Sequence, residues 1–208
     1  MSSARRAYLT VVPPADGTAW TDRDLVLALV ARDPQASVHA WRKYAPRIFG
    51  IVERTLGLAS DAEDITQDIF LRVFARVHTL RDPEALGSFV LSVALRVIKW
   101  HLRSRRVRKI LHLVERVPDL PIPGVDLEAR RTLRRFYEVL DALPADERMV
   151  FALRHIEGMT LSEVADASKI SLSTAKRRLQ RASLRVAKKT QADPALAGYS
   201  SRTNSDVE

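Results

Sequence analysis

The sequence predicts an all-helical fold, and three observations support that class. Hydrophobic residues make up 46% of the 208 residues, which is enough to build real cores. The chain has only 7 glycines and 6% aromatic residues, so turn formers are few, while Ala, Leu and Arg are abundant. Apolar residues also recur at helical spacing along several segments. We therefore expect two small helical domains joined by a proline-bearing linker, the second of them a helix-turn-helix domain.

The first two helices follow an N-terminal tail. Residues 1–20 are expected to be disordered, because paired prolines and a glycine break any helix there. Thr21 is placed to cap the first helix, and Asp33 before Pro34 is an N-cap followed by proline at the first helical position. Gly57 is expected to end the second helix.

Two further helices complete a first domain that spans residues 21–110. Ser60 and Glu63 form a capping box, and a clean apolar stripe at helical spacing follows. After a break across residues 79–87, another helix runs from about Ser88 into a strongly basic segment.

Prolines and a glycine mark residues 111–126 as a linker to a second domain, 127–189. In that domain Pro144 starts a helix that Gly158 closes, and the helix-turn-helix follows. Residues 190–208 are polar and are expected to form a disordered tail.

The helix-turn-helix is predicted from its caps and its apolar spacing. Thr160 and Glu163 form a capping box for the short helix, and Ile170 anchors the turn. Apolar residues of the longer helix fill one of its sides. These residues are Leu172, Ala175, Leu179, Ala182 and Val186.

The opposite side of the longer helix is basic and indicates DNA recognition. No acid occurs from Ser171 to Lys189, whereas a merely solvated face normally mixes charge signs. Arginine binds guanine bidentately or clamps phosphates, and short hydroxyls reach phosphates or base edges. The start of this helix attracts phosphate and points into the major groove in such motifs. The predicted DNA-binding residues are Ser171, Ser173, Thr174, Lys176, Arg177, Arg178 and Arg181, and the same face continues to Arg185.

The third helix of the first domain carries acidic and amide residues opposite its apolar stripe. Such a face on a basic protein is unsuited to DNA, so a protein partner is one interpretation. Alternatively, carboxylates near a helix N-terminus complement the helix dipole, which accounts for Asp61 and Asp64 better than for Gln67 and Asp68. The sequence leaves both interpretations open. The candidate partner-binding residues are Asp61, Asp64, Gln67, Asp68 and Arg72.

The fourth helix ends in six basic residues with an aromatic among them. Such a segment binds the DNA backbone or stacks on an unpaired base. The alternatives are that the charges complement the helix dipole, which accounts for two or three of them, and that Trp100 belongs to the core. The basic residues are Lys99, Arg103, Arg105, Arg106, Arg108 and Lys109.

Composition narrows the remaining function classes. The net charge of +9 favours nucleic acid or an anionic membrane as the partner. The lack of cysteine excludes disulfides, cysteine-based zinc sites and thiol catalysis. The five histidines show no metal-ligand spacing, and neither a phosphate-binding glycine loop nor a nucleophile elbow occurs. We expect no catalytic activity and no cofactor or metal.

Targeting signals are not evident. No apolar run is expected to approach the length of a membrane span, and residues 1–18 lack the apolar core of a signal peptide. A soluble, cytoplasmic protein without a membrane partner is therefore expected.

Three segments resemble the signatures of extracytoplasmic-function (ECF) sigma factors of bacterial RNA polymerase. Residues 61–74, DAEDITQDIFLRVF, resemble the family's DAED-x-x-Q-x-x-F-x-R-V signature. Leu143-Pro144 with Glu147-Arg148 resembles the start of the family's second conserved domain. Residues 174–182 stand where the family usually has TVKSRL followed by RA.

The resemblance covers about residues 22–188 and implies a role for each domain. The first domain would dock on the clamp of the polymerase large subunit through the acidic face, and would capture and melt the minus-ten promoter element through residues 79–88 and the next helix. The second domain would read the minus-thirty-five element through its basic face and contact the polymerase flap. Polymerase core and promoter DNA are the implied partners, with an anti-sigma factor as a further one.

The melting helix departs from the family's pattern. Where the family commonly has a run similar to WLYRIARN, this chain has residues 89–96, with Leu95-Arg96 in place of the Arg-Asn pair. A hydrophobic helix is kept, but the polar groups near the open strand differ. The candidate minus-ten residues are Arg96, Lys99, Trp100, Arg103 and Arg106.

Two other functions are compatible with the sequence. A stand-alone helix-turn-helix regulator with an N-terminal dimerisation domain would bind an operator without polymerase and leave a two-fold symmetric footprint. A polymerase-binding protein that no longer opens promoters is compatible with the missing Arg-Asn pair.

Overall fold

Helices and the turns between them make up residues 20–57, 61–110, 127–193 and 196, which the computed structural model describes, and these ranges contain no strand. The predicted all-helical class is confirmed. The elements in chain order are α1 (Asp22–Val30), α2 (Pro34–Leu56), α3 (Ala62–Arg76), η1 (Val77–Thr79), η2 (Pro83–Ala85), α4 (Leu86–Ile110), α5 (Leu127–Asp141), α6 (Ala145–Phe151), η3 (Ala152–Ile156), α7 (Leu161–Ser168) and α8 (Leu172–Gln191). The predicted linker, 111–126, and residues 1–19 of the predicted tail lie outside the described residues.

Helix ends in the first domain mostly follow their capping residues. Thr21 caps α1 in a reciprocal box with Asp24, each side chain bonding the other's backbone N–H at 3.1 Å. Asp33 caps α2, and Gly57 ends it with a φ of 87°. The Ser60 capping box is wrong, because Asp61 occupies the N-cap of α3 and makes no side-chain cap hydrogen bond. Ser60 itself lies outside the described residues.

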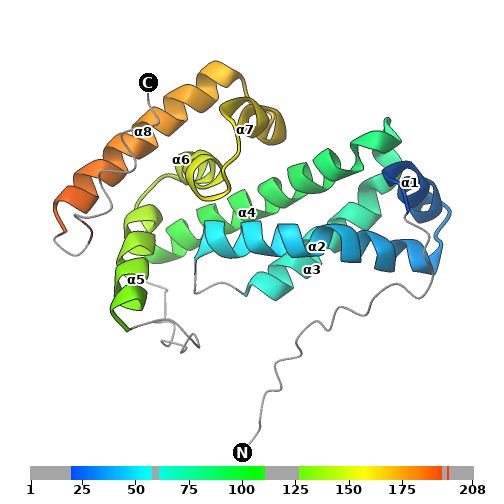
Figure 1. Cartoon of the computed structure of the whole chain (residues 1–208), viewed down its shortest axis with the longest axis horizontal. Coiled ribbons are helices and arrows are strands. Elements are labelled where there is room, and N and C mark those ends of the chain that lie inside the picture. Colours follow the sequence, from blue (N-terminus) through cyan, green and yellow to red (C-terminus); the bar gives the residue numbers. More distant parts are fainter. Residues whose placement is uncertain (1–19, 58–60, 111–126, 194–195, 197–208) are drawn as a thin grey trace, which may run out of the picture.

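The first domain packs α2, α3 and α4 around one apolar core, and α1 covers one end of it (Figure 1). Phe70 of α3 is fully buried, with its ring centroid 4.7 Å from that of Trp41 and 5.8 Å from that of Phe74. Ile51 and Ile98 are also fully buried, from α2 and α4. The predicted apolar stripes therefore face one another.

The second domain lies directly on the first. The η3 segment packs on α2, while α6 and α7 pack on α4 (Figure 1). The buried Arg148 donates to the backbone carbonyls of Thr55 and Leu56, at 2.9 and 3.1 Å. Arg54 forms a two-bond ion pair with Glu157. The two domains thus share one continuous set of buried side chains rather than standing apart.

The long helix α4 requires a correction to the membrane expectation. The segment Pro83–Val107 is long and apolar enough to cross a membrane by length and composition, with a mean hydropathy of 1.3 in its most apolar stretch. Half of that stretch is buried within the protein. The apolar character of α4 is accounted for by its place at the centre of the helix packing, where core helices have few charges.

Two details of the second domain differ from expectation. Leu172, predicted to face inward, is 43% exposed as the first residue of α8, and the apolar side of the helix is buried only from Ala175 onward. The predicted C-terminal tail starts too early, since α8 continues to Gln191 and Leu196 is fully buried. Asp193 also accepts hydrogen bonds from Arg135 of α5.

Candidate DNA- and polymerase-binding surfaces

The helix-turn-helix forms as its sequence predicts. Thr160 accepts from the Glu163 backbone N–H at 3.2 Å, and Glu163 accepts from the Thr160 N–H at 2.7 Å, which confirms the capping box. Lys169 ends α7 in the left-handed conformation with a φ of 54°, which turns the chain sharply toward α8. Ser171 then caps α8 by accepting from the Thr174 N–H. The inward side of α8 is buried at Ala175, Leu179, Ala182 and Val186.

The first turns of α8 present most of the predicted DNA-binding residues to solvent. Thr174 is half-buried, and its hydroxyl accepts a hydrogen bond from Ser171. Within the described part of the chain, no acid forms an ion pair with Arg177 or Arg181. The exposed members of the set are Ser171, Ser173, Lys176, Arg177 and Arg181. These side chains and the helix N-terminus form a surface that is open to a phosphate backbone.

Two arginines of the same face turn toward α6 instead. The Arg178 guanidinium lies 3.8 Å from the Asp146 carboxylate, and that of Arg185 lies 3.1 Å from Glu147. Arg178 is half-buried, so only part of the predicted surface is free in this arrangement. The sequence pattern does not mark Asp146 as a partner of these arginines, because a carboxylate in the first turn of a helix is ordinarily ascribed to the helix dipole.

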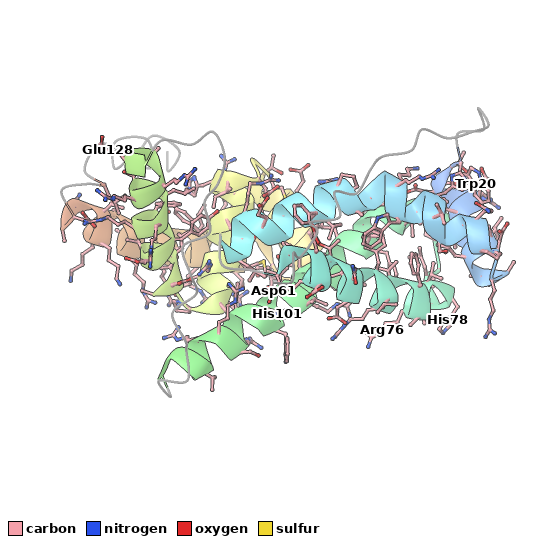
Figure 2. The ribbon with its side chains drawn as sticks, turned by 90° about the horizontal axis from the view of Figure 1, so that it is seen from below. Trp20, Asp61, Arg76, His78, His101 and Glu128 are labelled. Atoms are coloured by element: carbon pink, nitrogen blue, oxygen red, sulfur yellow. The ribbon has the colours of Figure 1, made fainter. Side chains whose placement is uncertain are left out.

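An open groove of about 880 Å³ lies between α3 and the C-terminal half of α4. Figure 2 shows its two labelled residues, Asp61 and His101, close to one another where the start of α3 faces α4. The α3 wall consists of Asp61, Asp64, Ile65, Asp68 and Arg72, and the α4 wall of Trp100, His101, Arg103, Ser104, Arg105 and Val107. The groove therefore has an acidic wall opposite a mixed basic and aromatic one.

The predicted partner-binding residues share the outer face of α3. Asp61, Asp64 and Gln67 are exposed, and Asp68 forms an i,i+4 ion pair with Arg72 at 2.9 Å. Gln67 is the one member of the predicted set that does not line the groove. The sequence pattern could not reveal the groove itself, because its second wall comes from α4.

The candidate minus-ten residues follow α4 but do not all face the same way. Arg96 is exposed and donates to the Ser92 carbonyl at 3.1 Å, while Arg106 is exposed near the helix end. The core interpretation of Trp100 is wrong, because this side chain is 59% exposed and packs edge-on against His101. Lys99 and Arg103 both reach Asp146 of the second domain.

Asp146 is the most heavily paired carboxylate on these surfaces. It contacts Lys99, lies 3.4 Å from Arg103 and lies 3.8 Å from Arg178. Partial burial acts to raise the pKa of Asp146, but the hydrogen bond from Lys99 and the three positive charges outweigh it and hold that pKa below its ordinary value. Asp146 therefore stays ionised between α4 and α8.

Comparison with known families matches both domains. Residues 40–108 match Sigma-70 region 2, and residues 133–186 match Sigma-70, region 4. The ferric citrate uptake sigma factor FecI of Escherichia coli (strain K12) is 32% identical over 149 residues, which are 69% of this chain and 81% of that protein. The ECF RNA polymerase sigma factor SigF of Caulobacter vibrioides (strain NA1000 / CB15N) is 30% identical over 135 residues, or 63% of this chain and 72% of that protein.

Solved structures share the fold at lower identity. CnrH, solved in complex with the cytosolic domain of CnrY, has a TM-score of 0.58 and 20% identity, covering 83% of this chain and 98% of that chain. The sigma factor RpoE from Bartonella quintana, solved with the anti-sigma factor NepR, has a TM-score of 0.52 and 19% identity, covering 72% and 92%. With both conserved regions matched in order, the chain belongs to the ECF sigma factors of bacterial RNA polymerase.

Proposed function

We propose that the two domains, 21–110 and 127–189, divide promoter recognition as the family does, with α3 binding the polymerase clamp, α4 capturing and melting the minus-ten element, and α8 reading the minus-thirty-five element. The observation that carries this proposal is that the protein has two surfaces of opposite charge. One is the acid-free start of α8, and the other is the acidic outer face of α3. A DNA-binding regulator that acts alone has no need of the second surface.

The groove beside α3 supports docking of a basic helix from the polymerase. Asp61 and Asp64 are exposed and, within the described part of the chain, have no ion-pair partner. Together these features fit an arginine-bearing partner better than a phosphate backbone.

The start of α8 supports readout of a duplex. Arg177 and Arg181 project from the exposed side near the helix N-terminus, where a recognition helix meets base edges. Hydroxyls at Ser171 and Ser173 are placed for phosphate. In the first domain, Arg96, Arg106 and the exposed Trp100 supply cations and a stacking surface for the minus-ten strand.

Other properties follow from this assignment. The protein acts by positioning polymerase and catalyses nothing itself, in the cytoplasm where its partners are. A cytoplasmic anti-sigma factor is a further partner, and the acidic face of α3 and the basic face of α8 are the surfaces that such an inhibitor would cover.

Run-off transcription with purified core polymerase is the test. The protein is expected to start transcripts at discrete sites, with permanganate-reactive thymines near the minus-ten position. Charge reversal at Asp64→Arg is expected to weaken core binding on the order of tenfold or more, since it places like charges against the partner. Glu128→Arg, an equal charge change on exposed α5, is expected to leave core binding unchanged. Absence of core binding by the unmodified protein would overturn the proposal, as would a symmetric footprint formed without polymerase.

Arginine-to-alanine substitution on α8 tests the minus-thirty-five assignment. Replacing Arg177 or Arg181 is expected to cost about 1–3 kcal/mol of promoter binding if the side chain contacts a base. Promoter variants changed at single base pairs, titrated with the holoenzyme, measure this loss and the relaxed discrimination that accompanies it. Lys188→Ala removes an equal charge from the exposed last turn of α8 and is the matched control. Unchanged discrimination in both arginine variants would assign them to backbone contacts alone.

A further inference from the structure

The second domain covers one face of α4. Leu95 is buried and lines a small cavity of about 130 Å³ between the domains, together with Met149 and Val150 of α6. An apolar side chain at this position lets α4 pack under α6 and α7, whereas an arginine there would have to bury its charge or turn away.

Polar contacts extend this packing along α4 toward its basic end. Lys99 and Arg103 lie one turn apart on the covered side, and both pair with Asp146. Arg178 reaches the same carboxylate from α8. One acid therefore holds basic side chains from both helices that the proposed function assigns to DNA.

A carboxylate and a phosphate present the same chemistry to these cations. Each offers anionic oxygens that accept hydrogen bonds from ammonium or guanidinium groups. While Lys99, Arg103 and Arg178 remain on Asp146, the carboxylate offsets one of their three positive charges, and the second domain covers one face of α4. Promoter phosphates and Asp146 therefore compete for these side chains.

We propose that this arrangement is a closed, self-inhibited state in which Asp146 takes the place of promoter phosphates and the second domain covers the minus-ten face of α4. DNA binding then requires the second domain to move off α4. This inference rests on the proposed function, because it takes Lys99, Arg103 and Arg178 as DNA contacts.

The ion pairs that Asp146 makes between the domains are individually weak. Asp146, Lys99 and Arg103 are each partly solvent-exposed, and ion pairs of that kind contribute little to stability. Opening also breaks the buried contacts of Leu95 and Arg148, so a partner that binds only the open form has to offset these in order to shift the equilibrium.

The test compares Asp146→Asn with Glu138→Gln in the full-length chain, without polymerase. Both substitutions remove one negative charge. Among the described residues, however, the exposed Glu138 pairs only with Arg134 of its own helix. Affinity is measured for a short fork-junction DNA of arbitrary sequence, since the contacts in question are to phosphates. Asp146→Asn is expected to bind this DNA roughly three- to tenfold more tightly than Glu138→Gln, because less of the protein is held closed.

Domain separation is measured on the same variants by energy transfer between dyes. The chain has no cysteine, so dyes attach only at the introduced residues of a Leu27→Cys, Leu184→Cys pair, both exposed positions in different domains. Asp146→Asn is expected to lower the energy transfer between the dyes, because it removes the ion pairs between the domains. Leu95→Arg is expected to lower it as well, because it places a charge in the apolar packing under α6. Equal DNA affinity of the Asp146 and Glu138 variants would overturn the inference, as would unchanged transfer in the Asp146 variant. Run-off transcription by the unmodified protein reports separately on the proposed function.

Discussion

Replacing Arg148 by alanine is expected to destabilise the folded protein by about 3 kcal/mol, because its charged hydrogen bonds to buried groups are lost. Its side chain is 4% exposed, pairs with Asp141 and donates to the carbonyls of Thr55 and Leu56. Those carbonyls belong to the last turn of α2, where helices have acceptors without internal partners. Arg148 therefore caps a helix of the first domain from the second.

Chemical denaturation followed by circular dichroism measures this loss. Arg148→Lys is expected to recover only part of it, because an ammonium cannot reproduce the planar donor pattern of the guanidinium. Glu157→Gln is the control, since it weakens a second contact between the domains whose arginine, Arg54, is 47% exposed. That change is expected to cost clearly less than Arg148→Ala, because glutamine keeps a neutral acceptor for Arg54 although Glu157 itself is only 10% exposed. A loss below 1 kcal/mol for Arg148→Ala would contradict the capping role.

Truncation of Phe70 to alanine is expected to cost about 3–5 kcal/mol, since it removes a fully buried aromatic and leaves a cavity. The ring packs against Trp41 and Phe74, so its loss loosens the contact of α3 with α2. Because the acidic outer face depends on the orientation of α3, core-polymerase binding is expected to weaken as well.

Thermal or chemical unfolding of the full-length protein checks this expectation. Phe70→Leu keeps most of the apolar volume and is expected to cost clearly less than the alanine variant. An equal loss in the two variants would mean that cavity formation is not the cause. Leu71→Ala, at the neighbouring position that is 68% exposed, is expected to leave stability within about 0.5 kcal/mol of the unmodified protein.

Local signals in the sequence predicted much of the fold. The caps at Thr21, Asp33 and Thr160 act within a few residues, so their hydrogen bonds can be predicted from the adjoining sequence. The failed capping box at Ser60 shows the limit of that reasoning, because Asp61 can occupy the same N-cap. Alternative capping residues next to one another differ by small energies that the surrounding chain decides.

The surfaces were less predictable, because helical projection shows which side of a helix a residue occupies but not what packs there. Arg178 and Arg181 both project away from the apolar side of α8, yet Asp146 meets only Arg178. Trp100 fits a core pattern by residue type, but its position on α4 leaves it exposed. Asp146 is distant from Lys99 in sequence, and the docking of two domains brings them together.

Gly57 ends α2 and also lies against the second domain. A β-carbon there would lie 2.8 Å from the ring of Tyr137 in α5, and the residue's φ of 87° already disfavours any larger side chain. Tyr137 in turn donates to the Arg54 carbonyl. Because residue 57 has no side chain, the backbone of the first domain can lie directly against the Tyr137 ring of the second domain. A larger residue at position 57 would therefore require the Tyr137 ring to move, although the two residues belong to different matched regions.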